Sequence, residues 1–264
     1  MKRSLEDIYI ENFARPRFAR FHRFLYLLGL RGLGVLNYQN EEQSGETYFL
    51  KSIVSEIDRE GRWVLDVGAN EGDIAASVLA ASERLKVLAI EPHPQIFARL
   101  KARFLGEARI ELENIGAGAK DATLSLFDYD DREGTGHASF FKDVIEGIHR
   151  GRAKSVDVPV RPLDPVVAEH KADIALIKID VEGFEFEVLC GLASTIEKHD
   201  VRYVIVEFNE MNVVSGSFVK NFIDMLPGYK PYRILPMGHL LPLEPYHALF
   251  VEIFAYQNIV FVKS

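Results

Sequence analysis

A short apolar run followed by two closely spaced glycines constrains this 264-residue chain more than any other feature. Trp63 to Val67 has the composition of a strand that is buried on both faces of a parallel sheet, and Asp66 lies near its end. Gly68 and Gly72 follow in a turn, and an alanine-rich segment predicts a helix over 74–81. A strand, a glycine turn and a helix in this order present a ligand at the carboxyl end of an open α/β sheet.

The spacing within the turn favours S-adenosylmethionine (SAM) over a dinucleotide. A dinucleotide fingerprint reads G-x-G-x-x-G, whereas this turn reads G-x-N-x-G, with Asn70 at its centre. The carboxylate of Asp66 would repel a pyrophosphate, but it suits the sulfonium and the ammonium of SAM. Gly68 and Gly72 lack a Cβ atom, so the backbone can turn sharply and a ligand can approach closely. The alternative is an ordinary tight turn between a strand and a helix.

A second predicted strand, Lys86 to Ile90, ends in Glu91 and Pro92. Glu91 lies 19 positions after Gly72. An acid at this place accepts hydrogen bonds from the ribose hydroxyls of a nucleoside. The feature supports a nucleoside but does not distinguish SAM from NAD.

The third predicted strand, Arg109 to Asn114, also ends in a polar residue. Asn114 and the neighbouring Ile115 are therefore candidates for contact with the adenine or its ribose. Turn chemistry is the alternative, because Asn and Gly are common in turns.

Glu46 precedes a helix that is predicted from Tyr48 to Ile57, with Ser44 or Thr47 as its N-cap. An acid near the start of a helix is favourable for the helix dipole. Glu46 therefore either stabilises the helix or lines the ligand cleft.

Residues 119–160 interrupt the alternation of strands and helices. The segments 122–127 and 156–160 alternate like two strands of a hairpin, and a polar, glycine-rich stretch lies between them. Loops of this length in compact domains are commonly functional. We predict that residues 128–155 form a mobile lid over the site. His137, within this stretch, is either a catalytic base or a solvated loop residue.

The fourth predicted strand, Ile174 to Ile179, ends in Asp180 and Glu182 and contains Lys178 in an otherwise apolar run. Acids at the carboxyl end of a central strand are unfavourable unless they face a cleft, so these two are candidates for function. A lysine inside such a strand needs a partner. The fifth strand, 201–206, is followed by Glu207.

Composition and charge exclude several classes of protein. The net charge is −8 and the isoelectric point is about 5.6, which argues against a general nucleic-acid partner. Cys190 is the single cysteine, so an intramolecular disulfide is excluded, and a reducing, cytoplasmic location is expected. No stretch approaches the roughly 20 apolar residues of a membrane span.

Residues 1–36 form a basic and aromatic segment that is predicted to be a helical extension of a domain over 37–264. Phe18, Phe21, Leu25 and Leu28 recur at helical spacing, with arginines between them. This helix either packs on the catalytic domain or on a second subunit, which would make a homodimer, or lies peripherally on an anionic membrane.

Together these stretches resemble the FkbM family of SAM-dependent methyltransferases, within the class I superfamily. The resemblance covers roughly residues 37–262. It is carried by Val64-Leu-Asp-Val-Gly-Ala-Asn-Glu-Gly72, Glu91-Pro92, Asn114 with Gly116, Arg161-Pro-Leu-Asp164, Lys178-Ile-Asp-Val-Glu-Gly-Phe-Glu185 with Leu189 and Gly191, Glu207, and Asn258-Ile-Val-Phe-Val.

The resemblance implies an α/β, Rossmann-like sheet of seven strands, here with an N-terminal helical extension and a hairpin insertion. It implies SAM as cofactor, S-adenosyl-L-homocysteine as product, and O-methylation of a sugar, a glycan or a secondary metabolite. The predicted cofactor-binding residues are Glu46, Asp66, Gly68, Asn70, Gly72, Glu91, Pro92, Asn114, Ile115 and Asp180.

Methyl transfer to a hydroxyl needs placement of the acceptor and a group that receives its proton. Asp180, Glu182 and His137 are the catalytic candidates, with Asp180 closest to the methyl group. Two carboxylates could also hold a divalent cation, but no further ligand cluster is apparent, so no metal is predicted. An NAD(P)-dependent oxidoreductase and a non-catalytic SAM-binding module are the alternatives.

Overall fold

The computed structural model describes residues 3–131 and 134–264, and its main feature is an eight-stranded sheet. The strand order is β10-β9-β11-β8-β7-β1-β2-β3. Strands β3, β2, β1, β7 and β8 pair in parallel, and β11 is antiparallel to both of its neighbours. The strands are β1 (Arg62–Val67), β2 (Lys86–Ile90), β3 (Ile110–Glu113), β7 (Asp173–Ile179), β8 (Tyr203–Phe208), β9 (Tyr229–Ile234), β10 (Leu240–Pro242) and β11 (Gln257–Lys263).

Seven of these strands form the predicted α/β sheet, and β10 is an additional edge strand. Strand β10 was not predicted, because it is only three residues long and contains Pro242, which is tolerated at a sheet edge. Strand β1 lies between β2 and β7. The segments that follow β1, β2 and β7 therefore meet at one edge of the sheet.

Helices cover both faces of the main sheet, and each face has its own apolar core. One core contains side chains of α4 (Glu46–Ile57), α5 (Asp73–Ala81) and α6 (Pro94–Arg103). The other contains side chains of α7 (Leu163–Glu169), α8 (Glu185–Cys190) and α11 (Val219–Met225). Strand β1 contributes to both, because successive side chains of a strand point to opposite faces. The shorter helices are α3 (Glu41–Ser44), α9 (Ala193–Lys198), α10 (Met211–Ser215) and α12 (Ala248–Val251).

The N-cap of α4 differs from the prediction. Gly45, and not Ser44 or Thr47, occupies this position, with φ of +73° and no side-chain cap. A Cβ atom at Gly45 would lie 1.9 Å from the carbonyl oxygen of Leu235. The close approach of another backbone therefore decides the residue here, which the local sequence does not reveal.

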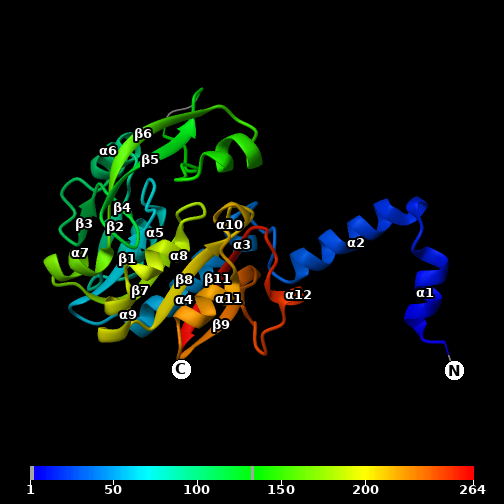
Figure 1. Cartoon of the computed structure of the whole chain (residues 1–264). Helices are drawn as coiled ribbons and strands as arrows, with labels where there is room; N and C mark the ends of the chain where they lie inside the picture. The colour runs from blue at the N-terminus through cyan, green and yellow to red at the C-terminus, as the bar shows by residue number, and fades with distance from the viewer. Residues whose placement is uncertain (1–2, 132–133) are drawn as a thin grey trace.

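A second, smaller sheet is the predicted hairpin insertion, and its order is β4-β6-β5. Strands β5 (Ala122–Tyr129) and β6 (Ala153–Arg161) pair antiparallel along their whole length, and β4 (Gly116–Ala117) joins β6. Figure 1 shows this sheet at one end of the main sheet. The connection between β5 and β6 includes a π-helical turn, Val144–Ile148. Residues 132 and 133 of the predicted lid lie outside the described residues.

The N-terminal segment forms an arm that projects away from the rest of the molecule (Figure 1). It comprises α1 (Leu5–Phe13), a 3₁₀ turn (Pro16–Phe18) and α2 (Ala19–Gly32). Helix α1 has no buried residue, and α2 buries only Leu30. The alternative that this helix packs on the catalytic domain is therefore contradicted, whereas a second subunit and a membrane surface stay predictions. Within residues 3–131 and 134–264, no helix has both the length and the apolar character that a membrane crossing requires.

Candidate active site

A hollow lies at the carboxyl ends of β1, β2 and β7. Six of the predicted site residues line it, namely Gly68, Asn70, Glu91, Pro92, Asp180 and Glu182. The turns after these strands and the connection between β5 and β6 form its walls. The polar or glycine residues among its lining are Gly68, Asn70, Glu91, Thr135, Gly136, Asp180 and Glu182. The apolar lining consists of Val67, Ile90, Pro92, Ile96, Ala117, Leu126, Ala138, Phe140 and Val181.

The glycine turn after β1 is packed directly against the turn after β7. A Cβ atom at Gly68, where φ is +81°, would lie 1.7 Å from the carbonyl oxygen of Asp180. Gly72, the N-cap of α5, also has a positive φ and packs against Phe104 and Leu100. The two glycines are thus required by the packing of the turn itself, and Gly72 lies outside the lining of the hollow.

The turn after β2 is held by Glu91 and Asn114. The two carboxylate oxygens of Glu91 accept hydrogen bonds from the backbone N–H groups of His93 (2.7 Å) and Asn70 (2.9 Å). Burial raises the pKa of Glu91 to about 7. Since a carboxylate has about four acceptor positions, two remain for ribose hydroxyls.

Asn114 and Ile115 do not line the hollow. The Asn114 amide donates hydrogen bonds to the carbonyl oxygens of Glu91 (2.8 Å) and Pro92 (3.1 Å), so it positions the turn that carries Glu91. Ile115 is buried in the apolar core. Ala117, in the short strand β4 that follows β3, lines the hollow instead of these two residues.

Asp66 and Lys178 lie side by side, since they are register partners in the parallel strands β1 and β7. The Lys178 Nζ atom is 3.3 Å from Glu46 Oε1 and 3.3 Å from Asp180 Oδ2. Burial by itself would lower the pKa of Lys178, but the carboxylates of Asp180 and Glu46 raise it well above its usual range. Lys178 is therefore the partner of two predicted site residues, and Glu46 reaches the site from α4.

The buried Asp66 carboxylate leaves one acceptor unused. Its Oδ2 atom has no hydrogen-bond partner within the described residues. Burial raises the pKa of Asp66 to about 7, although Lys178 opposes this effect. A buried acceptor without a donor is unfavourable in a folded protein.

These residues fit SAM. The ammonium of its methionine part would supply a donor to Asp66, and its ribose hydroxyls would supply donors to Glu91. The apolar walls of the hollow at Pro92, Ile96 and Phe140 suit an adenine ring.

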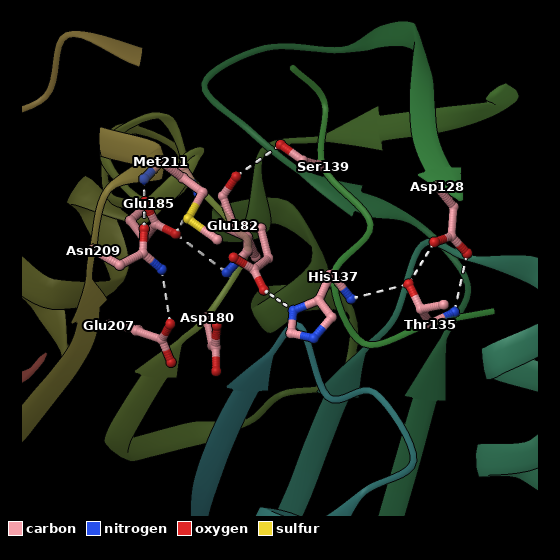
Figure 2. A network of polar contacts seen from close by, with 12 residues as sticks. Asp128, Thr135, His137, Ser139, Asp180, Glu182, Glu185, Glu207, Asn209 and Met211 are labelled. Carbon is pink, nitrogen blue, oxygen red and sulfur yellow. Dashed lines mark hydrogen bonds and ion pairs between the residues drawn. The ribbon is translucent and has the colours of Figure 1, made fainter. Parts of the chain in front are cut away.

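His137 and Glu182 contact each other, as Figure 2 shows. Glu182 lines the hollow, whereas His137 lies between the lining residues Gly136 and Ala138 and is not itself part of the lining. The His137 Nδ1 atom is 3.1 Å from Glu182 Oε1, and the Ser139 hydroxyl donates a hydrogen bond to the Glu182 carbonyl oxygen (2.7 Å). The Glu182 side chain is buried, whereas that of His137 is 57% exposed. The hydrogen bond to Glu182 raises the pKa of His137. Burial raises the pKa of Glu182 despite its contact with His137.

Glu185 fixes the turn between Asp180 and α8. Its Oε1 atom accepts hydrogen bonds from the backbone N–H groups of Gly183 (2.8 Å) and Val181 (3.3 Å), and its Oε2 atom accepts one from the Asn212 amide (3.0 Å). Burial raises the pKa of Glu185 to about 7. This role of Glu185 was not predicted. Its place in the K-x-D-x-E-G-x-E stretch, next to a glycine turn, was the signal available.

The connection between β5 and β6 is held over the hollow by Asp128. This carboxylate accepts hydrogen bonds from the backbone N–H groups of Gly134 (2.8 Å) and Thr135 (3.0 Å) and from the Thr135 hydroxyl (2.5 Å). Figure 2 shows this contact beside His137. Thr135 and Phe140 were not predicted as lining residues, because nothing in the local sequence distinguishes them from other loop residues.

In the described part of the chain, no three His, Cys, Asp or Glu side chains are arranged to hold a metal ion. The carboxylates of Asp180, Glu182 and Glu207 lie near one another (Figure 2). Each of them is instead positioned by other side chains of the protein, namely Lys178, His137 and Asn209.

The strand order and the glycine turn below this hollow are those of a Rossmann-like fold of the class I methyltransferase type. A family model described as the methyltransferase FkbM domain matches residues 66–230. The chain therefore belongs to the FkbM methyltransferase family, and the NAD(P)-dependent oxidoreductase alternative is excluded.

Two curated proteins are similar to this chain. The 2-O-methyltransferase NoeI of Sinorhizobium fredii is 23% identical over 201 residues, which cover 71% of this chain and 80% of NoeI. The AMB antimetabolite synthetase AmbE of Pseudomonas aeruginosa is 32% identical over 178 residues, which cover 56% of this chain but only 8% of AmbE. The solved structure of a TehB-like SAM-dependent methyltransferase from Corynebacterium glutamicum is 15% identical, with a TM-score of 0.43 over 93% of this chain and all of that one.

Proposed function

We propose that this protein transfers the methyl group of SAM to a hydroxyl oxygen of a sugar, a glycan or another polyhydroxylated acceptor. The observation that carries the proposal is the His137–Glu182 pair at 3.1 Å, because Glu182 lines the hollow together with Asp180. SAM supplies an electrophilic methyl group, and the protein supplies the placement and a base.

His137 is the proposed base. Its Nδ1 atom faces Glu182, so the neutral ring that donates from Nδ1 leaves Nε2 free to accept a proton from the acceptor hydroxyl. Glu182 then positions the ring and stabilises its protonated form. This assignment exchanges two of the roles predicted from the sequence, where Asp180 and Glu182 came first and His137 followed.

Asp180 is the proposed neighbour of the transferred methyl group. It ends β7 and lines the hollow, and one of its oxygens lies 3.3 Å from Lys178. The contact with a buried lysine fixes its direction. Its second oxygen can then face the sulfonium of SAM or accept a hydrogen bond from the acceptor.

The acceptor class follows from the groups that are available for recognition. Glu182 Oε2 is a buried acceptor atom without a hydrogen-bond partner among the described residues, and Glu207 lies nearby. Such atoms bind hydroxyl or amine donors. NoeI carries the description 2-O-methyltransferase, which supports an oxygen rather than a nitrogen as the site of methylation.

The test is methyl transfer by the purified protein from SAM to a panel of free sugars, glycans and hydroxylated secondary metabolites. S-adenosyl-L-homocysteine and the methylated product are both measured by mass spectrometry. We expect His137→Ala to slow transfer by about 10²–10⁴-fold, as is typical for loss of a general base, with unchanged SAM affinity.

The matched control is His170→Ala. His170 also contacts a glutamate, at 2.7 Å from Glu113, but Glu113 does not line the hollow, whereas Glu182 does. Full activity of the His137 variant on the true acceptor would contradict the assigned base. Methylation confined to nitrogen acceptors would contradict the proposed reaction.

A further inference from the structure

We propose that the N-terminal arm, residues 3–32, docks in the plane of a membrane surface that contains anionic lipids. This interaction is separate from the methyl transfer proposed above, because no residue of the arm lines the hollow.

The arm presents an apolar surface that the rest of the chain leaves uncovered. Phe21, Phe24, Leu25 and Leu28 recur at the spacing of one helical face in α2. All four are exposed, Phe24 to 59% and Leu28 to 56%. Helix α1 adds further exposed residues, among them Leu5 at 85%. Contiguous apolar surface of this kind on a folded protein marks an interaction site.

The two helices of the arm are joined by aromatic side chains. Tyr9 stacks on Phe13 with ring centroids 5.1 Å apart, and Phe13 contacts Phe18 at 5.3 Å. Tyr9 also lies 5.7 Å from His22 in α2. The aromatic contacts therefore fix α1 and α2 relative to each other, and the exposed apolar side chains of the arm are held in place by this packing.

The charge of the arm identifies the kind of surface. Residues 14–40 contain no Asp or Glu, whereas the whole chain has a net charge of −8. The basic residues of this segment are Arg15, Arg17, Arg20, Arg23 and Arg31. Arginines beside an apolar helical face are typical of helices that lie at the interface of anionic membranes. Their long side chains reach the headgroups while the apolar face enters the acyl boundary.

A second copy of the chain fits this charge less well. Pairing of α2 with α2 would bring arginines together without an acid in either segment to neutralise them. The acids of α1 are partly engaged within the arm itself, since Glu11 contacts Arg3 at 2.9 Å and Asp7 accepts a hydrogen bond from the Ser4 backbone. Anionic lipid supplies the missing negative charge.

The geometry of the arm allows it to lie flat. A 14-residue helix is about 21 Å long, shorter than the roughly 30 Å core of a bilayer. The base of the arm is held to the body, because Leu36 N–H donates to the Tyr256 carbonyl (2.8 Å) and the Arg233 guanidinium donates to the Leu33 carbonyl (3.3 Å). Docking of the arm therefore brings the whole domain to the surface.

The test is co-sedimentation of the full chain with vesicles of mixed phosphatidylcholine and phosphatidylglycerol, compared with pure phosphatidylcholine. We expect binding to the mixed vesicles only, and release at high ionic strength. Replacement of Arg17, Arg20 and Arg23 by Gln is expected to weaken binding by about 100-fold, since each basic residue at such a surface contributes about fivefold.

Two matched controls separate the arm from general charge and apolarity. Replacement of the exposed body residues Lys101, Lys120 and Lys198 by Gln removes the same charge, and binding is expected to be unchanged. Phe24→Ser with Leu28→Ser is expected to abolish binding, whereas Leu105→Ser with Leu249→Ser, at exposed sites on the body, is not.

Thermal unfolding of every variant verifies that it is folded, and the salt dependence of the unmodified chain needs no variant. Equal binding of the arginine and lysine variants would overturn the proposal. The proposal would also be overturned if the unmodified chain did not bind the vesicles but formed a dimer in sedimentation velocity, and if Phe24→Ser with Leu28→Ser converted this dimer to monomer.

Discussion

The two sides of the hollow are built differently. On the side of β1 and β2, polar side chains form hydrogen bonds with backbone groups. Glu91 accepts from two backbone N–H groups, and the Asn114 amide donates to two backbone carbonyls. On the side of β7 and β8, carboxylates contact other titratable side chains, as in the pair of Glu182 with His137. Backbone partners are rigid and do not titrate, whereas side-chain partners can move and change charge.

The β7–β8 side is also crowded with acids. Burial, together with the nearby carboxylates of Asp180 and Glu182, raises the pKa of Glu207 well above its usual range. The Asn209 amide donates one hydrogen bond to Glu207 (2.8 Å). This side therefore holds acceptors in excess of its donors, which a hydroxylated ligand would complete. Asp66 Oδ2 on β1 also lacks a donor among the described residues. Apart from this atom, the comparison supports the proposal that SAM binds on a preformed side and that the acceptor binds on a side that is completed on binding.

Gly68→Ala tests whether the two sides depend on one close contact, and it should have the largest effect. The new Cβ atom would lie 1.7 Å from the Asp180 carbonyl oxygen, so the turns after β1 and β7 must separate. We expect loss of both SAM binding and transfer, with destabilisation of more than about 4 kcal/mol by thermal unfolding. Gly61→Ala is the control, since Gly61 has φ of +83° with nothing within 4 Å of the added atom. The Gly61→Ala change should therefore destabilise the protein only by the cost of placing an alanine in the left-handed backbone conformation, about 1–2 kcal/mol. Equal effects of the two changes would contradict the contact.

Glu182→Gln tests the acceptor side alone. Glutamine keeps the shape but no longer stabilises the protonated ring of His137, so the transfer rate should fall by about 10²-fold or more. Calorimetry should find SAM affinity unchanged, because Glu91 and the β1 turn are untouched. If Glu182→Gln lowered the SAM affinity by as large a factor as the transfer rate, the two sides of the hollow would not act separately.

The pH dependence of the transfer rate tests the coupling of His137 to Glu182. The pKa of His137 is raised by its hydrogen bond to Glu182, and only the neutral ring can accept a proton. Activity should therefore fall as the pH decreases through this raised pKa, so the acid limb of kcat/KM lies above the ordinary histidine value of about 6.5. In the Glu182→Gln variant the limb should move to lower pH. A limb at the same pH in both proteins would argue against His137 as the base.

Glu91→Ala tests the cofactor side and should have the smallest effect. Loss of charge-assisted hydrogen bonds to ribose should weaken SAM binding by about 1–3 kcal/mol in calorimetry, while the rate at saturating SAM changes little. Glu111→Ala removes an exposed acid from the neighbouring strand β3 and should leave SAM affinity unchanged. Equal SAM affinity of the Glu91 variant and the wild type would refute its assignment to the ribose.

Much of this arrangement was determined by the sequence itself. The apolar runs before Asp66, Glu91 and Asp180 predicted the parallel strands β1, β2 and β7, because an apolar run bounded by turn residues has few other stable forms. Parallel strands with helical connections end at the same sheet edge, so the convergence of these acids could be inferred as well. The hairpin over 122–160 was likewise visible as alternation.

Only the tertiary structure decided which groups touch. His137 and Glu182 are separated by 45 positions, and no local pattern encodes their contact. Gly45 caps α4 because Leu235 approaches it, and Asn114 turns inward because two carbonyls lie beside it. The sequence likewise left open what the apolar face of the arm contacts, because such a face has the same pattern whether it is covered by a core or left exposed. Local sequence determines periodicity, whereas contacts between distant segments depend on how the whole chain packs.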